Sequence, residues 1–488
     1  MNYLYLRFSR QIGIASIASL SIYLRNLLLV PIFTRVLGAA DYGVWVQIFA
    51  CLELFLGIAF LGLNQTLLRF LPQRREEGSL ADDFISILVT TFSAGLALAV
   101  LGVFLSDEAA VLFLDTRENA LVLKVSFGLI PISVVSNLVL SYFRASRQIV
   151  LYSTLLLLES CGYIGLAIIF VMKGFGIYGV IGALLILRAS ICLIGGGIIF
   201  HQIGFSIPTF VCLRPFLSFG LPLVPLGIFT WTTNVSDRYV LAFFWGAEAS
   251  GIYSVSYGLG SIVGLFFSPL FFILGPALVE LWESKNWSAI QEYLTYAQKY
   301  PLLIAIPFTI LLTVYSKEII GIWATKEFLA SPVLIALTAL GIIAMNLAAI
   351  VETTITLLYR TRVIPLIYLC CAVINIVSNI LIIPFWGMMG AAVTTLLAYS
   401  LQLLLMYLYI KQFYPFAWNW PFFSRSTIAA GAMMVCLFLF QNMDLPWRNF
   451  GLFAGPGIFI GTLALLGGFE AREWSLLKRL LALDGSRV

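Results

Sequence analysis

Charged residues are scarce in this chain. Only 10% of its 488 residues are Asp, Glu, Lys or Arg, whereas 61% are hydrophobic. A soluble domain carries about 25% charged residues, so this chain has too few charges to solvate the surface of a globule of its size. The scarcity excludes a soluble enzyme, a disordered scaffold and a nucleic-acid-binding protein with a basic face.

Histidine is almost missing, since His201 is the only one, and the seven cysteines form no CxxC pair. These counts argue against a histidine metal centre and a histidine-based catalytic triad. Nearly all the cysteines lie in apolar runs, where they act as small packing residues. No GxxxxGK[ST] motif for ATP phosphates occurs. The sequence therefore predicts no cofactor, no metal site and no enzymatic activity.

What the chain does have is a succession of apolar runs of membrane-spanning length. A spanning helix needs about 20 such residues, whereas a membrane barrel would show ten-residue segments of alternating hydrophobicity. We expect an all-α polytopic membrane protein with about 14 transmembrane helices. They are placed at residues 12–33, 42–63, 84–105, 121–142, 151–172, 178–200, 219–244, 250–275, 301–323, 332–358, 363–383, 388–410, 427–443 and 450–469.

Lys and Arg collect in alternate loops, with Arg69 and Lys299 among those on the more basic side, and this asymmetry predicts the orientation. Cytoplasmic loops carry the excess of positive charge. We therefore expect both termini to be cytoplasmic, in a multi-pass protein of the inner (plasma) membrane. Residues 471–488 are predicted to form a cytoplasmic amphipathic tail that contacts membrane lipid.

Two glycine motifs recur along the chain. Their glycines reappear 208 or 211 positions later: Gly38 and Gly43 match Gly246 and Gly251, and Gly176 and Gly179 match Gly387 and Gly390. Such spacing predicts two six-helix bundles, at 1–213 and 214–415, that form a parallel pseudo-repeat around a central cavity. Two extra transmembrane helices follow at 416–470.

Eight ionisable residues fall inside the predicted helices. They are Arg25, Lys124, Arg188, Arg238, Glu53, Glu159, Asp237 and Glu352. Each costs about 2.5–3.5 kcal/mol at the bilayer centre, so we expect them to face a protein interior or a water-filled cavity. Lys124 lies near a helix end, from which it can reach the membrane surface, and is interpreted as structural.

Polar residues form stripes on two of the predicted helices. Thr230, Thr233, Asn234 and Asp237 follow helical spacing, with Arg238 next to them. Such a stripe lines a cavity or packs on another polar helix. A second stripe holds Asn375, Ser378 and Asn379, and asparagines of this kind also join helices to one another.

Several of these motifs resemble the polysaccharide flippases, which export lipid-linked oligosaccharide repeat units. The resemblance covers nearly the whole chain and rests on three segments: Leu37, Gly38, Tyr42 and Gly43; Asp237, Arg238 and Tyr239 followed by Gly251, Tyr253 and Tyr257; and Ile382, Pro384, Gly387 and Gly390. It implies membership of the multidrug/oligosaccharidyl-lipid/polysaccharide exporter superfamily. In that superfamily two bundles form a V around a central cavity and work by alternating access.

The resemblance implies that the substrate is an undecaprenyl-diphosphate-linked oligosaccharide, moved from the cytoplasmic to the outer leaflet. Arg25, Arg188 and Arg238 are then candidates to bind the diphosphate, together with Asn234. Glu53, Asp237, Glu159 and Glu352 are candidates for coupling to a proton or sodium ion. Other polysaccharide-assembly proteins are further expected partners.

Three alternatives stay open at this point. A peptidoglycan-precursor flippase is a near neighbour in the same superfamily. A drug or organic-cation antiporter would favour a carboxylate-dominated cavity, whereas here the ionisable residues within the predicted helices are four cations and four acids. A membrane-embedded glycan polymerase or ligase would need a large outer loop with acidic pairs. Asp82-Asp83 and Asp107-Glu108 lie in short loops and are interpreted as solvated helix caps.

Overall fold

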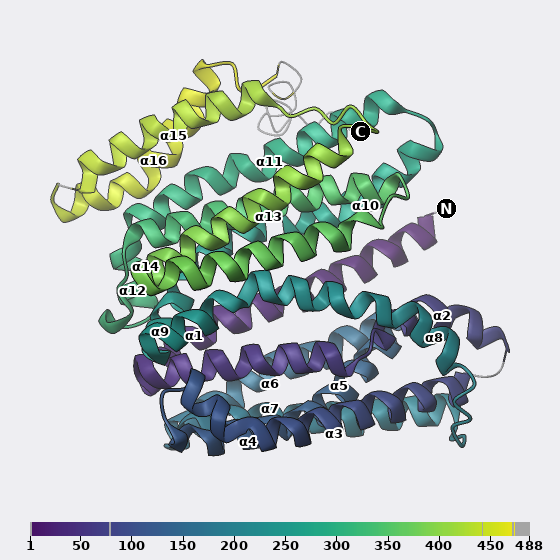
Figure 1. Cartoon of the computed structure of the whole chain (residues 1–488). Coiled ribbons are helices and arrows are strands. Elements are labelled where there is room, and N and C mark those ends of the chain that lie inside the picture. Colours follow the sequence, from purple (N-terminus) through teal and green to yellow (C-terminus); the bar gives the residue numbers. More distant parts are fainter. Residues whose placement is uncertain (1, 78–79, 442, 471–472, 474–488) are drawn as a thin grey trace. The chain divides into compact units, whose positions relative to one another are not determined.

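The computed structural model describes residues 2–77, 80–441, 443–470 and 473, and these residues fold into helices without a β-strand (Figure 1). Apolar sequence takes this form because a helix satisfies its own backbone hydrogen bonds within a bilayer. Within the described residues, ten helices are long and apolar enough to cross a membrane. The expected all-α polytopic membrane fold is confirmed.

In three places a single glycine with non-helical backbone angles separates a pair of expected helices, without a longer loop. The kinks lie at Gly38 in α1 (Asn2–Ala59), at Gly246 in α9 (Val224–Ser261) and at Gly387 in α14 (Val363–Ile410). Each glycine has a positive φ, which side chains rarely adopt. A single glycine thus turns the chain where the sequence predicted a loop, and the count of 14 stays a prediction.

The first of two compact units holds Met1–Val255, Ile320–Leu329 and Tyr368–Ala391. In it, α5 packs on α3 and α7, and α6 packs on α1 and α7 (Figure 1). Besides α1, the larger part of α9 and parts of α12 (Ser316–Trp323) and α14, its helices are α2 (Leu63–Glu77), α3 (Leu80–Phe113), η1 (Arg117–Asn119), α4 (Ala120–Phe127), α5 (Leu129–Ala145), α6 (Ile149–Met172), α7 (Gly176–Ile203), α8 (Leu213–Gly220), η2 (Leu221–Leu223) and η4 (Lys326–Phe328).

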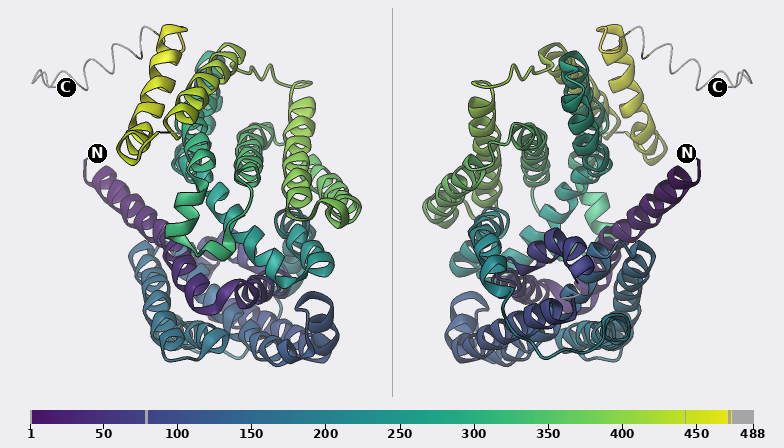
Figure 2. Two further views of the ribbon diagram at one scale, coloured as in Figure 1. Left: turned by 90° about the vertical axis from the view of Figure 1, so that its left-hand side faces the viewer. Right: turned by 90° about the vertical axis from the view of Figure 1, so that its right-hand side faces the viewer.

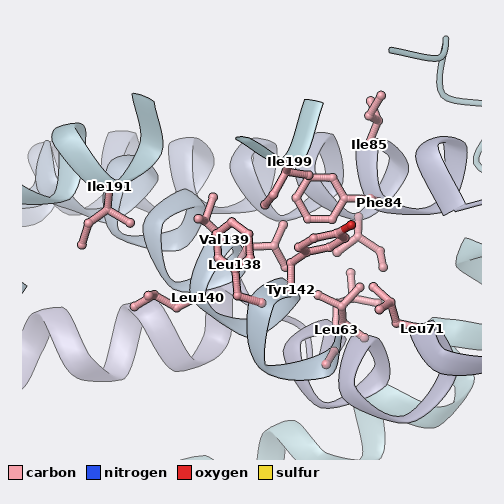
Figure 3. Close-up of a cluster of buried hydrophobic side chains, with 14 of the residues drawn as sticks. Leu63, Leu71, Phe84, Ile85, Leu138, Val139, Leu140, Tyr142, Ile191 and Ile199 are labelled. Carbon is pink, nitrogen blue, oxygen red and sulfur yellow. The ribbon is translucent and has the colours of Figure 1, made fainter. Parts of the chain in front are cut away.

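A buried apolar cluster holds this unit together at one end. Leu63 and Leu71 from α2 lie against Phe84 of α3 and Tyr142 of α5, with Ile199 of α7 beside them (Figure 3). Burying a side chain of this kind stabilises the fold by about 1.5–3 kcal/mol. The cluster fixes α2 to three longer helices, which matters for the site below.

The second unit holds Ser256–Ile319, Ala330–Ile367 and Ala392–Val488. In it, α11 packs on α13 and α15, and α15 and α16 lie side by side as a helical hairpin (yellow in Figures 1 and 2). Its helices, besides parts of α9, α12 and α14, are η3 (Ile262–Phe266), α10 (Ser268–Glu283), α11 (Trp287–Val314), α13 (Pro332–Leu357), α15 (Trp420–Gln441) and α16 (Leu445–Leu465). These two units are defined by contacts, and their limits differ from the predicted bundles at 1–213 and 214–415. The division into two six-helix bundles stays a prediction.

Lys299 corrects one sequence-based assignment. The charge pattern placed it in a cytoplasmic loop, but α11 begins at Trp287 and buries it, with only 2% exposed. Burial is tolerated because Nζ lies 2.5 Å from Glu473 Oε2 and near the ring faces of Phe422 and Phe469. Apart from Glu473, the predicted amphipathic tail at 471–488 lies outside the described residues.

The Glu473 contact should depend on pH. Burial raises the pKa of its carboxyl, but hydrogen bonds from Lys299 Nζ and from the Glu470 backbone outweigh this and hold the pKa below its usual range. A lowered native pKa stabilises the fold above the unfolded value of about 4.3, and this stabilisation is lost as pH falls through the native pKa.

We therefore expect Glu473→Gln to lower the melting temperature at neutral pH. The difference from wild type should shrink towards zero as both proteins are measured in increasingly acidic buffer. A difference that stays constant down to about pH 3 would mean that the residue acts by packing and not by charge.

Candidate substrate-binding site

The site is built around a break in the helical backbone between α1 and α2. Leu61 and Gly62 there both have positive φ. Gly62 packs directly on Gly220 of α8, since a Cβ on Gly62 would lie 2.1 Å from the Gly220 carbonyl oxygen. The absence of side chains at both positions lets α2 and α8 meet at backbone distance.

A wide cavity of about 930 Å³ lies among α1, α2, α8 and α9. Its volume falls in the upper part of the range found for ligand pockets, about 300–1,000 Å³. The polar lining residues are Glu53, Gln65, Arg69, Thr230 and Asn234. The remaining wall is apolar, so one end of an amphipathic ligand can be solvated while the rest packs on hydrocarbon.

A smaller cavity of about 230 Å³ lies among α1, α5, α6 and α7. Its polar lining residues are Arg25, Glu53, Ser133, Asn137, Glu159 and Arg188. Arg188 Nε lies 3.6 Å from Glu159 Oε1, and its Nη1 donates a hydrogen bond to Ser133 Oγ. The guanidinium of Arg25 lies over the ring of Tyr163, 5.6 Å from its centroid. Four predicted site residues therefore share one cavity.

Some polar atoms around this smaller cavity are buried without a partner. In the part of the chain that the structure describes, Nε of Arg25, Nε of Arg188 and the hydroxyl of Tyr163 have no hydrogen-bond partner. An unsatisfied buried polar group costs about 1–3 kcal/mol. A ligand that brings hydrogen-bond acceptors would remove this cost, and phosphate oxygens are such acceptors.

Glu53 lines both cavities, and its side chain is exposed to them. Arg238, Arg188 and Arg25 all act electrostatically on its carboxylate. Yet within the described ranges neither Glu53 nor Arg25 forms an ion pair within 4.0 Å. The three predicted arginines thus surround a carboxylate that none of them neutralises by direct contact.

Asp237 and Arg238 make contacts inside the protein, whereas the polar stripe made them candidates to line a cavity. Arg238 Nη1 donates to the Asn234 carbonyl at 2.7 Å and lies 3.8 Å from Asp237 Oδ1. Asp237 is fully buried and accepts a hydrogen bond from the Tyr253 hydroxyl at 2.6 Å. Of the stripe, Thr230 and Asn234 line the wide cavity, whereas Thr233 and Asp237 are buried. Neither Asp237 nor Arg238 lines the two cavities described above.

Other predicted residues lie apart from these cavities. Glu352 is half-buried in α13 of the second unit. Asn375 and Asn379 share buried hydrogen bonds with Ser236, which favours their interpretation as contacts between helices. Lys124 pairs with Asp107 at 2.8 Å, as a structural role requires.

The interpretation of Asp82-Asp83 as solvated caps is wrong. Asp82 accepts hydrogen bonds from both the backbone N–H and the hydroxyl of Thr209, at 2.7 and 2.6 Å. Asp83 is buried, with 7% exposed. Asp82 therefore fixes the connection between α7 and α8 to the start of α3, a contact across more than a hundred residues that spacing could not indicate.

The kinked segments of α1 and α9 pack on each other through small residues. A Cβ on Gly43 would lie 1.9 Å from the Ala247 carbonyl oxygen, and one on Gly251 would lie 2.6 Å from that of Ala39. The two contacts are equivalent, because Gly251 lies 208 positions after Gly43, and Ala247 lies 208 positions after Ala39. This is what a twofold relation of the two segments requires, while the repeat of whole bundles stays a prediction.

Asp115 caps the helix that begins after the Gly246 kink. Its Oδ2 accepts a hydrogen bond from the Ala247 backbone N–H at 2.8 Å, a group that the kink leaves without an intrahelical partner. We expect Asp115→Ala to lower the free energy of unfolding by about 0.5–2 kcal/mol, whereas Asp115→Asn should keep most of the cap.

Chemical unfolding of the purified variants checks this expectation. Asp107→Ala is the matched control, because it removes only a half-exposed pair with Lys124, worth about 0–1 kcal/mol. Equal stability of Asp115→Ala and wild type would contradict the assigned cap.

Arg69 is the charged lining residue that the sequence did not predict, and Gln65, Ser133 and Asn137 are polar lining residues that it also did not predict. Charge counting placed Arg69 on the cytoplasmic side without a role, because no spanning helix was predicted there. A signal was present: Leu63, Leu67 and Leu71 repeat every four residues, as do Gln65 and Arg69 between them. This pattern predicts a short amphipathic helix with its polar side towards a cavity.

Comparison with known proteins yields consistent similarities. Residues 8–282 match the sequence model of the polysaccharide biosynthesis protein family, and residues 240–453 match that of the lipid II flippase MurJ. A probable low-salt glycan biosynthesis flippase, Agl15 of Haloferax volcanii, is 22% identical over 89% of each chain. All of these similarities concern transporters or biosynthesis proteins of the membrane.

Solved structures show the same fold. The lipid II flippase MurJ in an inward closed conformation is 18% identical, with a TM-score of 0.70 over 98% of this chain and 100% of its own. The multidrug transporter DinF-BH of the MATE family is 14% identical, with a TM-score of 0.60 over 83% of this chain and 95% of its own.

Proposed function

The chain belongs to the polysaccharide biosynthesis protein family, among the flippases of the multidrug/oligosaccharidyl-lipid/polysaccharide exporter superfamily, and from this premise we propose its substrate. It would move undecaprenyl-diphosphate-linked oligosaccharide from the cytoplasmic to the outer leaflet by alternating access. The observation that carries the proposal is the smaller cavity, where Arg25 and Arg188 each keep a buried Nε without a hydrogen-bond partner among the described residues.

A diphosphate would meet complementary chemistry in this cavity. Arg25 makes no ion pair within the described residues, and Arg188 is held in place by Glu159 and Ser133. Guanidinium groups stay charged and can hold phosphate oxygens by two hydrogen bonds each. Arg238 would add positive charge nearby without lining the cavity, and Asn234 would contact the substrate from the wide cavity.

Glu53 offers a route to ion coupling. With Glu53 ionised, the acids Glu53, Glu159 and Asp237 balance the three arginines in formal charge. Because an ionised Glu53 repels a diphosphate and a protonated one does not, the protonation state of Glu53 and the binding of the substrate depend on each other. We propose Glu53 as the coupling residue, with Asp237, Glu159 and Glu352 as further candidates for a proton or sodium ion.

A lipid II flippase is the second candidate, favoured by the MurJ match over 240–453 and by the fold. A drug antiporter is disfavoured, because the smaller cavity holds two cations beside its two acids. The proposed setting is the inner membrane with both termini cytoplasmic. Reporter fusions would test this, with residue 75 expected on the cytoplasmic side and residue 110 on the outer side.

Depletion of the protein in its native host separates the two substrates. We expect undecaprenyl-diphosphate-linked oligosaccharide to accumulate and surface glycan to fall, while peptidoglycan synthesis continues. Restoring the wild-type chain should reverse both changes. Accumulation of peptidoglycan precursor with cell lysis would favour the second candidate, and no change in either lipid would contradict both.

A further inference from the structure

We propose that Arg69 is the first phosphate-binding residue of the transport path. It would receive the phosphate of the lipid-linked substrate in the wide cavity, before the headgroup reaches Arg25 and Arg188. The inference rests on the proposed function and adds to it a binding site at the start of the transport path. Three features of α2 and its surroundings support it.

The first feature is the way α2 is held. Its apolar side, with Leu63, Leu67 and Leu71, is buried in the cluster shared with α3 and α5 (Figure 3). Gln65 and Arg69 occupy the other side and line the wide cavity. Residues four apart share one helix face, so the buried leucines fix the direction in which Arg69 projects.

The second feature is an aromatic support under the guanidinium. Its Cζ lies 4.5 Å from the ring centroid of Phe219 and 5.4 Å from that of Phe70. Phe70 in turn stacks on Phe216 at 5.4 Å, and Thr66 donates a hydrogen bond to the Phe216 carbonyl. A guanidinium that lies on a ring keeps its N–H edge free for a ligand.

The third feature is that no acidic side chain that the structure describes pairs with Arg69. Among the described residues Arg69 forms no hydrogen bond or ion pair, and its side chain is exposed. The wide cavity is also lined by Glu53, which lines the smaller cavity of Arg25 and Arg188 as well. An anion bound at Arg69 therefore lies in a cavity that shares a wall residue with the cavity of these two arginines, and this residue is the one proposed to couple transport.

Phosphate could reach this cavity from the lipid-linked substrate or from an ordinary phospholipid headgroup. We assign the substrate, because Thr230 and Asn234 face the same cavity and can hydrogen-bond the sugar or diphosphate. The two sources are separated by measuring the binding of undecaprenyl diphosphate and of phosphatidylglycerol to the purified protein by native mass spectrometry.

Arg69→Ala should weaken undecaprenyl diphosphate binding tenfold or more and leave phosphatidylglycerol binding unchanged. Arg69→Lys should keep part of the affinity, because charge survives while the two-pronged contact is lost. Phe219→Leu, which removes the ring but not the charge, should fall between wild type and Arg69→Ala. Arg144→Ala, at an exposed arginine outside both cavities, is the matched control and should bind like wild type.

The outcomes separate this inference from the proposed function. Wild-type affinity in Arg69→Ala, with melting temperature unchanged, would overturn the role of Arg69 alone. An equal loss of both lipids would make the cavity a general headgroup site and also overturn the inference. If wild-type protein binds no undecaprenyl diphosphate at all, the proposed function itself fails.

Discussion

Arg25→Ala should lower transport of undecaprenyl-diphosphate-linked oligosaccharide at least tenfold at normal membrane abundance. A hydrogen bond to a charged group contributes about 1.5–3 kcal/mol, and about 1.4 kcal/mol corresponds to a factor of ten. Because Arg25 makes no ion pair within the described residues, its removal leaves no carboxylate without a direct partner. Arg25→Lys should retain part of the activity.

Arg188 needs a compensated variant. Its removal alone leaves Glu159 buried without its partner, and breaking a buried pair costs about 3–5 kcal/mol. We therefore compare Arg188→Ala/Glu159→Gln with Glu159→Gln alone, in transport assays at matched abundance. A further tenfold loss in the double variant is expected. Full transport by this double variant and by Arg25→Ala would refute the assignment of the diphosphate to the smaller cavity.

Gly43→Leu is expected to abolish folding or transport. Even its Cβ would lie 1.9 Å from the Ala247 carbonyl oxygen and 3.2 Å from the Gly251 nitrogen, so the kinked segments of α1 and α9 would have to separate. Overpacking of this kind costs about 1–3 kcal/mol and sometimes more. Thermal unfolding and transport of the purified variant measure the two effects.

The matched control for this substitution is Gly165→Leu in α6. A Cβ there meets nothing within 4 Å, so the added side chain should be accepted with little change in melting temperature. Gly43→Ala should fall between Gly43→Leu and wild type. If Gly43→Leu melts and transports like Gly165→Leu, the close contact between α1 and α9 does not exist in the working protein.

The helices could be predicted from the sequence because apolar length leaves a bilayer segment almost no other structure. The glycine motifs also marked the positions of real kinks, since Gly38, Gly246 and Gly387 adopt backbone angles that other residues avoid. What hydropathy could not show is that a single glycine, without a longer loop, separates the two helices of each pair.

The site was partly predictable for a similar reason. Arg25, Glu53, Glu159 and Arg188 meet in one cavity, which fits the high cost of exposing a charge to lipid, whereas Asp237, Arg238 and Glu352 lie elsewhere. Arg69 was missed because it lies on a short helix after the expected span. A charge outside the bilayer has no cost of insertion, so it does not indicate a functional role. Lys299 was misplaced because its partner Glu473 lies 174 residues further along, and single-sequence patterns carry no information on such pairs.

The central claim is that this chain moves a diphosphate-linked glycan by means of the arginines around Glu53. The most direct test is transbilayer movement of undecaprenyl-diphosphate-linked oligosaccharide in liposomes that contain purified protein at known density. We predict rapid movement with wild type and with Arg144→Ala, and at least tenfold slower movement with Arg25→Ala. Equal rates for wild type, Arg25→Ala and protein-free liposomes would contradict the account.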